Sequence, residues 1–406
     1  MMMRKTILIL VLVLAVTCGW AQQVAVNGRV VDTETHKPVA GASVTAGGLS
    51  VITNEDGFFV LKSSQPVEAL VVSHLGYRSQ RISLEAQHDG TLSISLKPAS
   101  IQLGEVLVMG NNARELVMSA IRRIPDNYSM KEELQHCFYR EKVMKRQNYI
   151  SVAEGVLDMY KTGYDYGSEY DRAAIRKGRR LLSPKQSDTL SVKVLGGPAT
   201  ALNLDIVKNV EFLLNAEELF LYDLKMEMPA TIADRRQYVV SIAPRATVSY
   251  ALYFGRLYID QETLAFTRAE LELDMSNREK ATNMMLVKKP RGLRFRPKEL
   301  SCVIDYRTGD DGKTRVSYMR NTFRFNCDWK RRLFATSFTA FCEMAVTSTT
   351  SQDVRPIRGR DSFDQRDAFF DKVDYFRDPA FWQDYNIIEP SESLDKAIDK
   401  LLKRYR

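Results

Sequence analysis

Residues 24–98 alternate between hydrophobic and polar positions with the period of a half-buried β-strand. The runs 24–30 and 92–96 place an apolar residue at almost every second position. Between such runs, the Asn-Glu-Asp-Gly turn at 54–57 has a clear mechanism, because Asn and Asp bond to their own backbone and Gly accepts a positive φ. Short strands with turns roughly every 8–12 residues are typical of a β-sandwich, which we predict for residues 22–98.

A helical period follows the sandwich. The apolar stripe of this predicted helix, over 112–124, consists of Leu116, Val117, Ala120, Ile121 and Ile124. Asn111 or Asn112 is placed to cap its start, and Pro125 lies just past its end. We therefore predict a linker and helix over 99–130.

Strand patterns return over 131–350. The runs 137–142 and 149–154 alternate, and residues 221–347 read as successive antiparallel strands with a hairpin loop at 309–312. The overall prediction is a mainly β protein, in which the sandwich is followed by a larger antiparallel-sheet α+β domain.

Two segments interrupt the strands of this larger domain. Residues 161–200 are polar, basic and rich in Gly and Pro, which predicts a long exposed loop. A second helix is predicted over 203–219, where Ile206, Val210 and Leu213 recur at helical spacing.

The remaining residues, 351–406, are predicted to form an extended tail and a C-terminal helix. The apolar face of that helix consists of Leu394, Ala397, Ile398, Leu401 and Leu402.

The N-terminus has the pattern of a secretory signal. Arg4 and Lys5 precede an apolar run, and Gly19-Trp20-Ala21 supplies small residues for signal peptidase, so cleavage before Gln22 is expected. Cys18 raises a lipoprotein alternative, although Thr17 fits poorly before it. No other run reaches about 18 uninterrupted apolar residues, and we expect no transmembrane helix in the mature chain.

Four motifs of the predicted sandwich resemble a known family. The stretches 28–32, 38–44, 53–59 and 73–78 look like the carboxypeptidase-regulatory-like domain. That domain is a transthyretin-like sandwich common in Gram-negative envelope proteins and often found at the N-terminus of outer-membrane receptors. The resemblance implies a non-catalytic domain and export to the periplasm or the periplasmic face of the outer membrane.

Two further resemblances concern the rest of the chain. The run 138–141, together with 381–390, resembles a group of secreted proteins that carry the same sandwich. The strand–turn–strand run 255–273 is similar to the curved sheets of periplasmic lipid- and lipoprotein-carrier proteins.

Net charge and cysteine content narrow the compartment and the partners. The formal charge is +8, and loss of Arg4 and Lys5 would leave +6, which favours anionic surfaces mildly. An exported protein is not expected to bind nucleic acid. The cysteines beyond the signal are Cys137, Cys302, Cys327 and Cys342. A cross-strand disulfide and buried free thiols both fit their pattern.

The motifs of the common enzyme classes are missing from the sequence. The four histidines, at 36, 74, 88 and 136, form no His-x-x-Glu pair and no His-Glu-x-x-His motif. The sequence also contains no Gly-x-Ser-x-Gly elbow and no phosphate-binding glycine loop. His136 and Cys137 would point to opposite faces of a strand, so they make a poor catalytic pair. No cofactor is expected.

Carboxylates leave one enzyme class open. A glycosidase-type hydrolase needs only two of them, and Glu154, Asp158 and Glu270 lie on strand patterns. Solvated strand faces are the simpler interpretation of these residues.

Basic clusters are the strongest functional signal. Six basic residues lie close together and are predicted to bind an anionic surface: Lys288, Lys289, Arg291, Arg294, Arg296 and Lys298. A second cluster lies in the predicted loop and consists of Arg172, Arg176, Lys177, Arg179 and Arg180. The tyrosines at 160, 164, 166 and 170 could stack on carbohydrate or peptide, or simply edge a sheet.

These observations together predict a non-enzymatic, periplasm-facing envelope protein. Its β-rich domain would bind an envelope protein, a lipid or an outer-membrane component. The alternatives are an accessory subunit of an outer-membrane transporter or assembly system, and a carboxylate-dependent hydrolase.

Overall fold

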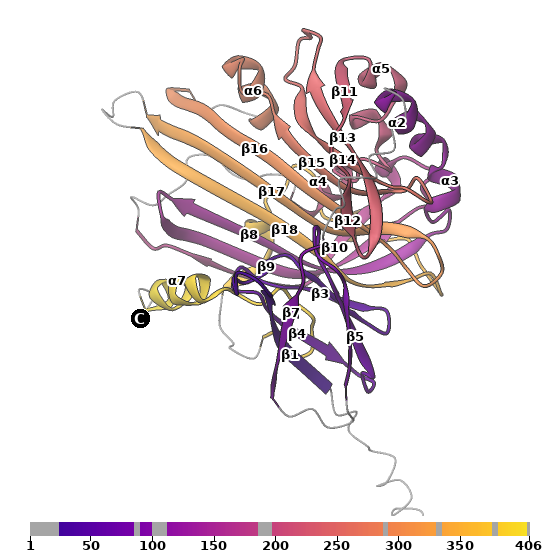
Figure 1. Ribbon diagram of the computed structural model, residues 1–406. Helices are drawn as coiled ribbons and strands as arrows, with labels where there is room; N and C mark the ends of the chain where they lie inside the picture. The colour runs from indigo at the N-terminus through magenta and orange to yellow at the C-terminus, as the bar shows by residue number, and fades with distance from the viewer. Residues whose placement is uncertain are drawn as a thin grey trace, which may run out of the picture.

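The computed structural model describes residues 24–84, 90–99, 112–185, 197–286, 291–329, 335–375 and 381–403. The predicted signal peptide and Cys18 lie outside these residues. The described chain forms an N-terminal β-sandwich packed against a much larger antiparallel sheet (Figure 1). The mainly β class predicted from the alternating patterns is confirmed.

The sandwich consists of two small sheets. One has the order β4-β1-β7 and the other β3-β2-β5-β6. The strands are β1 (Val24–Asp32), β2 (Ser43–Ala46), β3 (Leu49–Ile52), β4 (Phe58–Ser63), β5 (Ala69–Ser73), β6 (Gln80–Ser83) and β7 (Thr91–Leu96). Their alternating residues, such as Val30, Leu61 and Val72, are fully buried between the sheets.

The turn before β4 forms as its residue types predict. The Asn54 side-chain oxygen accepts hydrogen bonds from the backbone N–H groups of Asp56 and Phe58, both at 2.9 Å. Gly57 has φ +73°, and a Cβ there would lie 2.3 Å from the Val30 carbonyl oxygen. Only glycine fits this position without a shift of the backbone.

The large sheet runs in the order β11-β13-β14-β15-β16-β17-β18-β8-β9-β10-β19, with β12 also paired to β13. Its strands are β8 (Glu133–Lys145), β9 (Asn148–Lys161), β10 (Arg172–Leu182), β11 (Tyr222–Met226), β12 (Ala230–Ile232), β13 (Arg235–Pro244), β14 (Tyr253–Asp260), β15 (Phe266–Leu273), β16 (Leu293–Thr308), β17 (Thr314–Trp329), β18 (Thr336–Thr350) and β19 (Asp374–Tyr375). At about 3.4 Å per residue, the central strands are roughly 50 Å long.

Short helices cover one face of this sheet, and the sandwich and the C-terminal tail cover part of the other (Figure 1). The helical elements are α2 (Ala113–Arg122), α3 (Ile124–Asn127), η2 (Ser168–Tyr170), α4 (Gly197–Asn203), η4 (Val210–Phe212), α5 (Ala216–Leu219), α6 (Arg278–Met285), η5 (Gly359–Asp361), η6 (Phe369–Lys372) and α7 (Glu392–Leu402). We refer to the two sides as the helix face and the sandwich face. No helix of the described residues is long and apolar enough to cross a membrane.

The predicted helices at either end of the larger domain are confirmed. α2 begins after Asn112, whose side chain accepts the Glu115 N–H and caps the helix. α7 buries Leu394, Ile398 and Leu401 against the start of β9 and the end of β10.

The prediction of a long exposed loop over 161–200 is wrong, because residues 172–182 form β10 and pair with β9. Three of the basic side chains of this stretch, Lys177, Arg179 and Arg180, stack on aromatic rings of the C-terminal tail. Arg180 lies 4.8 Å from the ring centroids of both Phe370 and Tyr375.

The single helix predicted over 203–219 is also wrong, since the structure has the end of α4, then η4 and then α5. Asn and Asp residues divide this stretch, as their side chains compete for backbone groups. Asn215 caps α5 by accepting the Glu218 N–H, and Asp205 turns inward to a buried lysine.

The four cysteines are buried free thiols, so the disulfide alternative is not observed. Sheet register explains why Cys302 and Cys342 do not bond. Both pair with Asn321, one from each side, which separates their Cα atoms by about two strand spacings, or roughly 10 Å. A disulfide needs less than about 7 Å.

Candidate functional site in the cleft between the sandwich and the sheet

The sandwich is clamped to the sheet by a C-terminal strap, residues 381–391. The Lys62 N–H donates to the Asn386 side chain (2.7 Å), which returns a hydrogen bond to the Lys62 carbonyl (2.9 Å). The Asn54 amide donates to the Pro390 carbonyl (2.9 Å). On its other side the strap inserts Trp382 against Phe138 of β8, with ring centroids 5.8 Å apart. Three segments distant in sequence therefore surround one space.

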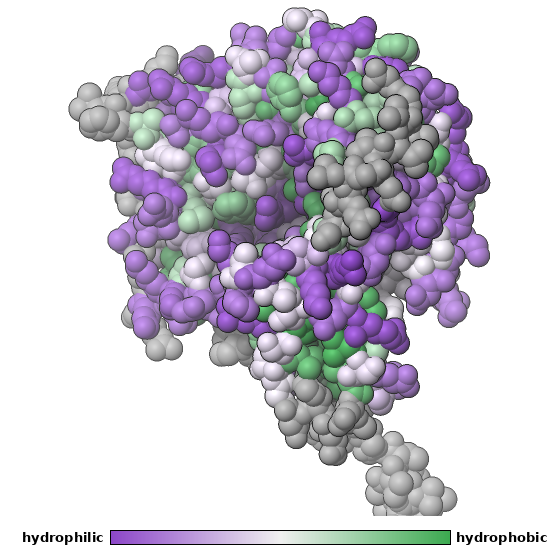
Figure 2. Space-filling view, viewed as in Figure 1, coloured by the Kyte–Doolittle hydropathy of each residue, from purple (hydrophilic) through white to green (hydrophobic). Residues whose placement is uncertain are grey.

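That space is a cleft of about 250 Å³. The sheet lines it with six charged side chains, Arg140, Lys142, Arg268, Asp305, Arg320 and Glu343. The sandwich adds Glu55 and His74, and the strap adds Glu389. Figure 2 shows a hollow on this face, rimmed by hydrophilic residues, above the sandwich.

Arg140 anchors one wall of the cleft. It is 2% exposed, and its guanidinium donates to Glu154 (2.7 Å), to Glu343 (3.4 Å) and to the Ile388 carbonyl of the strap (2.6 Å). Burial acts to raise the pKa of Glu154, but Arg140 and Arg179 outweigh it and hold that pKa below its usual value. The sheet and the strap thus share one satisfied ionic network.

Lys142 links the sheet to the sandwich. Its ammonium group lies 3.1 Å from the Glu55 carboxylate and 3.7 Å from that of Glu343. Its position two residues after Arg140 places both cations on the sandwich face of β8.

The opposite wall holds Arg268, Asp305 and His74. Arg268 donates to Asp305 (2.7 Å) and to Glu270 (2.8 Å). Burial still raises the pKa of Asp305. Burial and the nearby Arg268 lower the pKa of His74, so its ring is neutral at neutral pH. Among the described residues, none bonds to the buried His74 Nδ1 atom.

Arg320 differs from the other cations of the cleft. It lies on β17 between Val303 and Glu343 in the sheet register, and it is exposed. Within the described part of the chain, no ion pair or hydrogen bond occupies its side chain. Glu55, Asp305 and Glu343 are already paired with Lys142, Arg268 and Arg140. Arg320 is therefore the one cation lining the cleft, among the described residues, without a direct hydrogen bond or ion pair, and its charge helps to lower the pKa of Glu343.

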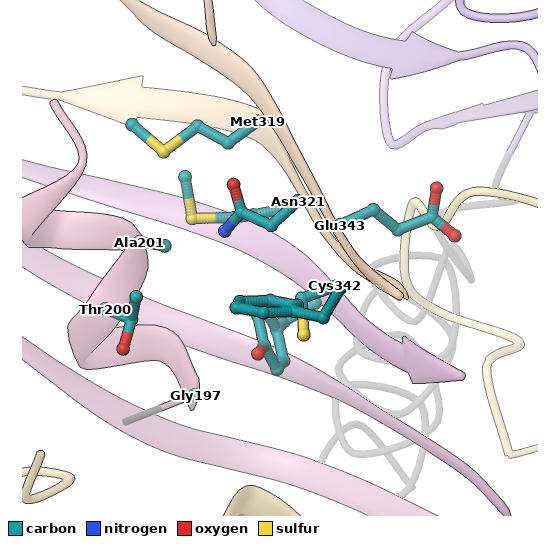
Figure 3. A pocket seen from close by; sticks show the side chains of 10 residues that line it. Gly197, Thr200, Ala201, Met319, Asn321, Cys342 and Glu343 are labelled. Carbon is teal, nitrogen blue, oxygen red and sulfur yellow. The ribbon is translucent and has the colours of Figure 1, made fainter. Parts of the chain in front are cut away.

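The helix face of the same strands offers much less space. A pocket of about 20 Å³ lies between α4 and the sheet, enough for about one water molecule. Figure 3 shows Met319 and Asn321 directed toward α4, with Glu343 extending to the opposite side. Ligand sites are usually about 300–1,000 Å³, so this pocket is too small for a lipid chain.

Glu141 is buried on this helix face, where Tyr139 donates a hydrogen bond to it (2.8 Å). Burial raises the pKa of Glu141 from 4.5 to about 7. The native state therefore holds a proton that the unfolded chain releases between these two values, and stability falls as the pH rises through that window.

We expect the free energy of unfolding to drop by up to about 3 kcal/mol from about pH 5 to about pH 8 because of Glu141. Glu141→Gln should abolish most of this drop, as glutamine still accepts the Tyr139 bond but cannot ionise. Urea unfolding at both pH values measures the difference. An equally steep loss in Glu141→Gln would exclude Glu141 as its source.

A second buried network lies deeper on the helix face. Asp205 accepts hydrogen bonds from Lys161 (2.5 Å), Tyr164 (2.9 Å) and Tyr306 (3.0 Å). Lys208 donates to Asp171 at 2.7 Å, and both side chains are fully buried. Asp205, Lys161 and Lys208 are enclosed by core residues, which indicates a role in stability.

The structure separates the two basic clusters found in the sequence. Arg294, Arg296 and Lys298 project from β16 as exposed residues, with Arg291 exposed just before the strand. Lys288 and Lys289 lie outside the described residues. The cluster in β10 is engaged: Arg176 bonds to Asp158, Arg179 to Glu154 and Arg180 to the Phe370 carbonyl, while Lys177 and Arg172 bond to other backbone carbonyls.

The other candidate residues do not converge on one site. His136 bonds to Asp158 (2.7 Å), whereas Cys137 is buried in the opposite core, as expected for adjacent strand residues. Tyr160 and Tyr164 are buried, while Tyr166 and Tyr170 are exposed and in ring contact. Glu154 belongs to the Arg140 network, and Glu270 pairs with Arg268.

Sequence reasoning missed the cleft because its walls come from residues up to 336 positions apart, as in the Asn54–Pro390 contact. One signal was present. In the run 138–142, Phe, Arg and Lys alternate with Tyr and Glu, so both faces carry large or charged side chains. This is unusual for a strand with one face buried and the other exposed to solvent. Such a pattern fits a strand covered on both sides.

The fold and cleft define a two-part β protein whose sandwich is fixed to a large sheet. A family model described as "CarboxypepD_reg-like domain" matches residues 26–108. This N-terminal region therefore belongs to the CarboxypepD_reg-like family. It is similar to the TonB-dependent receptor SusC of Bacteroides thetaiotaomicron, with 39% identity over 94 residues, or 23% of this chain. The match spans only 9% of the receptor's length.

Solved structures align loosely with the larger part of the chain. A putative outer membrane lipoprotein-sorting protein domain from Vibrio parahaemolyticus is 11% identical, covering 62% of this chain and 97% of that one, with a TM-score of 0.27. A DUF1329 family protein from Desulfovibrio piger is 12% identical, covering 58% and 94%, with a TM-score of 0.24. These scores are too low to carry an inference.

Proposed function

We propose that this protein is a non-enzymatic, periplasm-facing envelope protein that binds an acidic segment of an envelope partner in the cleft. The observation that carries the proposal is Arg320, whose guanidinium forms no direct ion pair or hydrogen bond within the described residues, in a cleft whose other cations are already paired. A carboxylate from outside would complete the pattern, and charge-assisted hydrogen bonds of this kind contribute about 1.5–3 kcal/mol.

Two features of the N-terminal region support a location in the cell envelope. The first 21 residues have the pattern of a secretory signal, and the sandwich is similar to part of the TonB-dependent receptor SusC. The strap supports a fixed geometry, because it holds the sandwich against the sheet and so keeps both walls of the cleft in place. A preformed site loses less entropy on binding.

The cleft can be tested by isolating partners with the full chain from native membranes. Arg320→Ala should reduce recovery of the specific partner about tenfold, since one charge-assisted bond is lost. Arg122→Ala removes an exposed arginine from α2 and is the matched control. Equal recovery by the wild type and both variants would contradict a role for the cleft.

An accessory role beside an outer-membrane transporter is a specific form of this proposal. The similarity of the sandwich to part of the SusC receptor supports it. If the protein has this accessory role, the partner that the wild type isolates is a TonB-dependent receptor, and Arg320→Ala isolates less of it.

A carboxylate-dependent hydrolase is the second candidate, because Asp305 and Glu389 both line the cleft and burial raises the pKa of each. Each carboxylate already faces cations, since Asp305 lies beside Arg268 and Glu389 is influenced by Lys62 and Arg140. This arrangement favours a binding site over a hydrolase. New cleavage products from envelope fractions that disappear with Glu389→Gln would favour the hydrolase.

A further inference from the structure

One end of the large sheet gathers basic residues from three separate segments. The β8–β9 turn, the start of β16 and the end of β17 meet there, on the left in Figure 1. Sheet register connects them: Arg296 pairs with Asn326, Asn326 pairs with Ser337, and the Arg146 N–H donates to the Ser337 carbonyl (2.8 Å). We call this the basic edge; its members are Lys145, Arg146, Arg291, Arg294, Arg296, Lys298 and Arg324.

The charge of the basic edge is strongly unbalanced. Among its described residues, seven basic side chains stand against two acidic ones, Glu299 and Asp328, which gives +5 where the whole chain carries +8. The turns at the opposite end of the sheet carry Asp260, Glu262, Asp310 and Asp311, and arginines pair with three of them: Arg235 with Asp260 and Glu262, and Arg315 with Asp311. The basic edge therefore carries a local excess of positive charge that the balanced turns at the opposite end do not.

The conformation of Arg146 is a second, independent observation. It lies in the two-residue turn between Lys145 and Asn148 and has φ +57°. Glycine or asparagine adopts this left-handed conformation with less strain than other residues. An arginine that projects from such a turn, where glycine would suit the backbone better, points to a function for its charge.

Apolar residues lie next to the basic edge. Met284 of α6 is 41% exposed, and α6 packs against β16. Behind the edge, Phe295, Phe325 and Phe338 stack across neighbouring strands, with centroids 5.0 and 5.8 Å apart. The positive charges lie at the ends of several strands, beside an exposed methionine. This arrangement fits the surface of an anionic membrane better than a narrow, soluble anionic polymer.

We propose that the basic edge docks onto the phosphate headgroups of an anionic bilayer. The lysines and arginines meet the lipid phosphates, and Met284 reaches the interface beside them. None of the residues of the basic edge lines the cleft, so binding to a membrane leaves the lining of the cleft for a partner.

The mature full chain should bind vesicles of phosphatidylcholine and phosphatidylglycerol mixed at about three to one, with the salt sensitivity of a surface charge effect. The triple change Arg294→Gln, Arg296→Gln and Lys298→Gln should weaken this binding about 100-fold, at roughly fivefold per charge. Vesicles of phosphatidylcholine alone should bind neither protein.

A matched triple controls for net charge. Arg355→Gln, Arg358→Gln and Arg360→Gln removes the same charge from exposed positions of the tail and should change vesicle binding less than threefold. An equal loss in both triples, an unaltered affinity of the edge triple, or tighter binding to soluble heparin than to vesicles would each overturn the proposal.

Arg146→Gly separates function from folding. Its vesicle binding should fall about fivefold, while its thermal midpoint stays the same or rises because the turn is relieved of strain. Unchanged vesicle binding would remove Arg146 from the surface. Arg320→Ala should leave vesicle binding intact, so failure of the cleft proposal and failure of this one remain distinguishable.

Discussion

Replacing Arg140 with alanine is expected to lower the free energy of unfolding by about 3–5 kcal/mol, because it leaves Glu154 buried without its main counterion and takes one of two cations, Arg140 and Lys142, away from Glu343. The Ile388 carbonyl of the strap also loses its donor. Arg140 is 2% exposed, so little water can reach the groups that it leaves behind. Urea unfolding of the full chain measures the effect.

Arg146→Ala is the control for the Arg140 variant, because it removes an exposed arginine near the end of the same strand. It should change the free energy of unfolding by no more than about 0.5 kcal/mol. A loss below about 1 kcal/mol in Arg140→Ala would mean that the network is hydrated and adds little to stability.

The second large effect is expected on the helix face. Asp205→Ala should cost about 3–5 kcal/mol, since it leaves the Lys161 ammonium buried without its carboxylate. The hydroxyls of Tyr164 and Tyr306 lose their acceptor as well. The expected 3–5 kcal/mol includes the cost of these hydroxyls, since a buried polar group left without a partner costs about 1–3 kcal/mol.

Two further variants define what Asp205 contributes. Asp205→Asn keeps a hydrogen-bond acceptor but removes the charge, and its cost should fall between those of the wild type and Asp205→Ala. Asp223→Ala removes an exposed aspartate of β11 and should be nearly neutral. Equal stability of Asp205→Ala and Asp223→Ala would show that the buried network is not structural.

Local chemistry made much of the fold predictable. The Asn54 turn, the Asn112 cap and the apolar stripe of α7 depend on residues only a few positions apart, and all form as expected. The similarity of the sandwich to a known domain rests on such turns too. Hydrophobic periodicity was therefore enough to predict an element where one face is buried and the other is exposed to solvent.

The failures have a common physical cause, which is contact with residues far along the chain. The polar and basic sequence of β10 predicted a loop, because the aromatic rings at 370–381 on which its arginines stack lie far along the chain. The cleft was not predicted because Lys142, Asn54 and Arg268 meet only after the sandwich docks. The sequence predicted the part of the basic edge that lies at the start of β16. Arg146 and Arg324 could not be predicted, because only the register of the sheet brings them beside it.

The central claim is that the cleft receives an acidic segment of an envelope partner. A photo-crosslinking residue placed at Phe341, on the cleft floor beside Lys142, tests it most directly in cells. The account predicts one dominant crosslinked partner from position 341, absent from position 122 on α2, and lost when Arg320→Ala is added. Equal crosslinking from both positions, or a partner unaffected by Arg320→Ala, would contradict it.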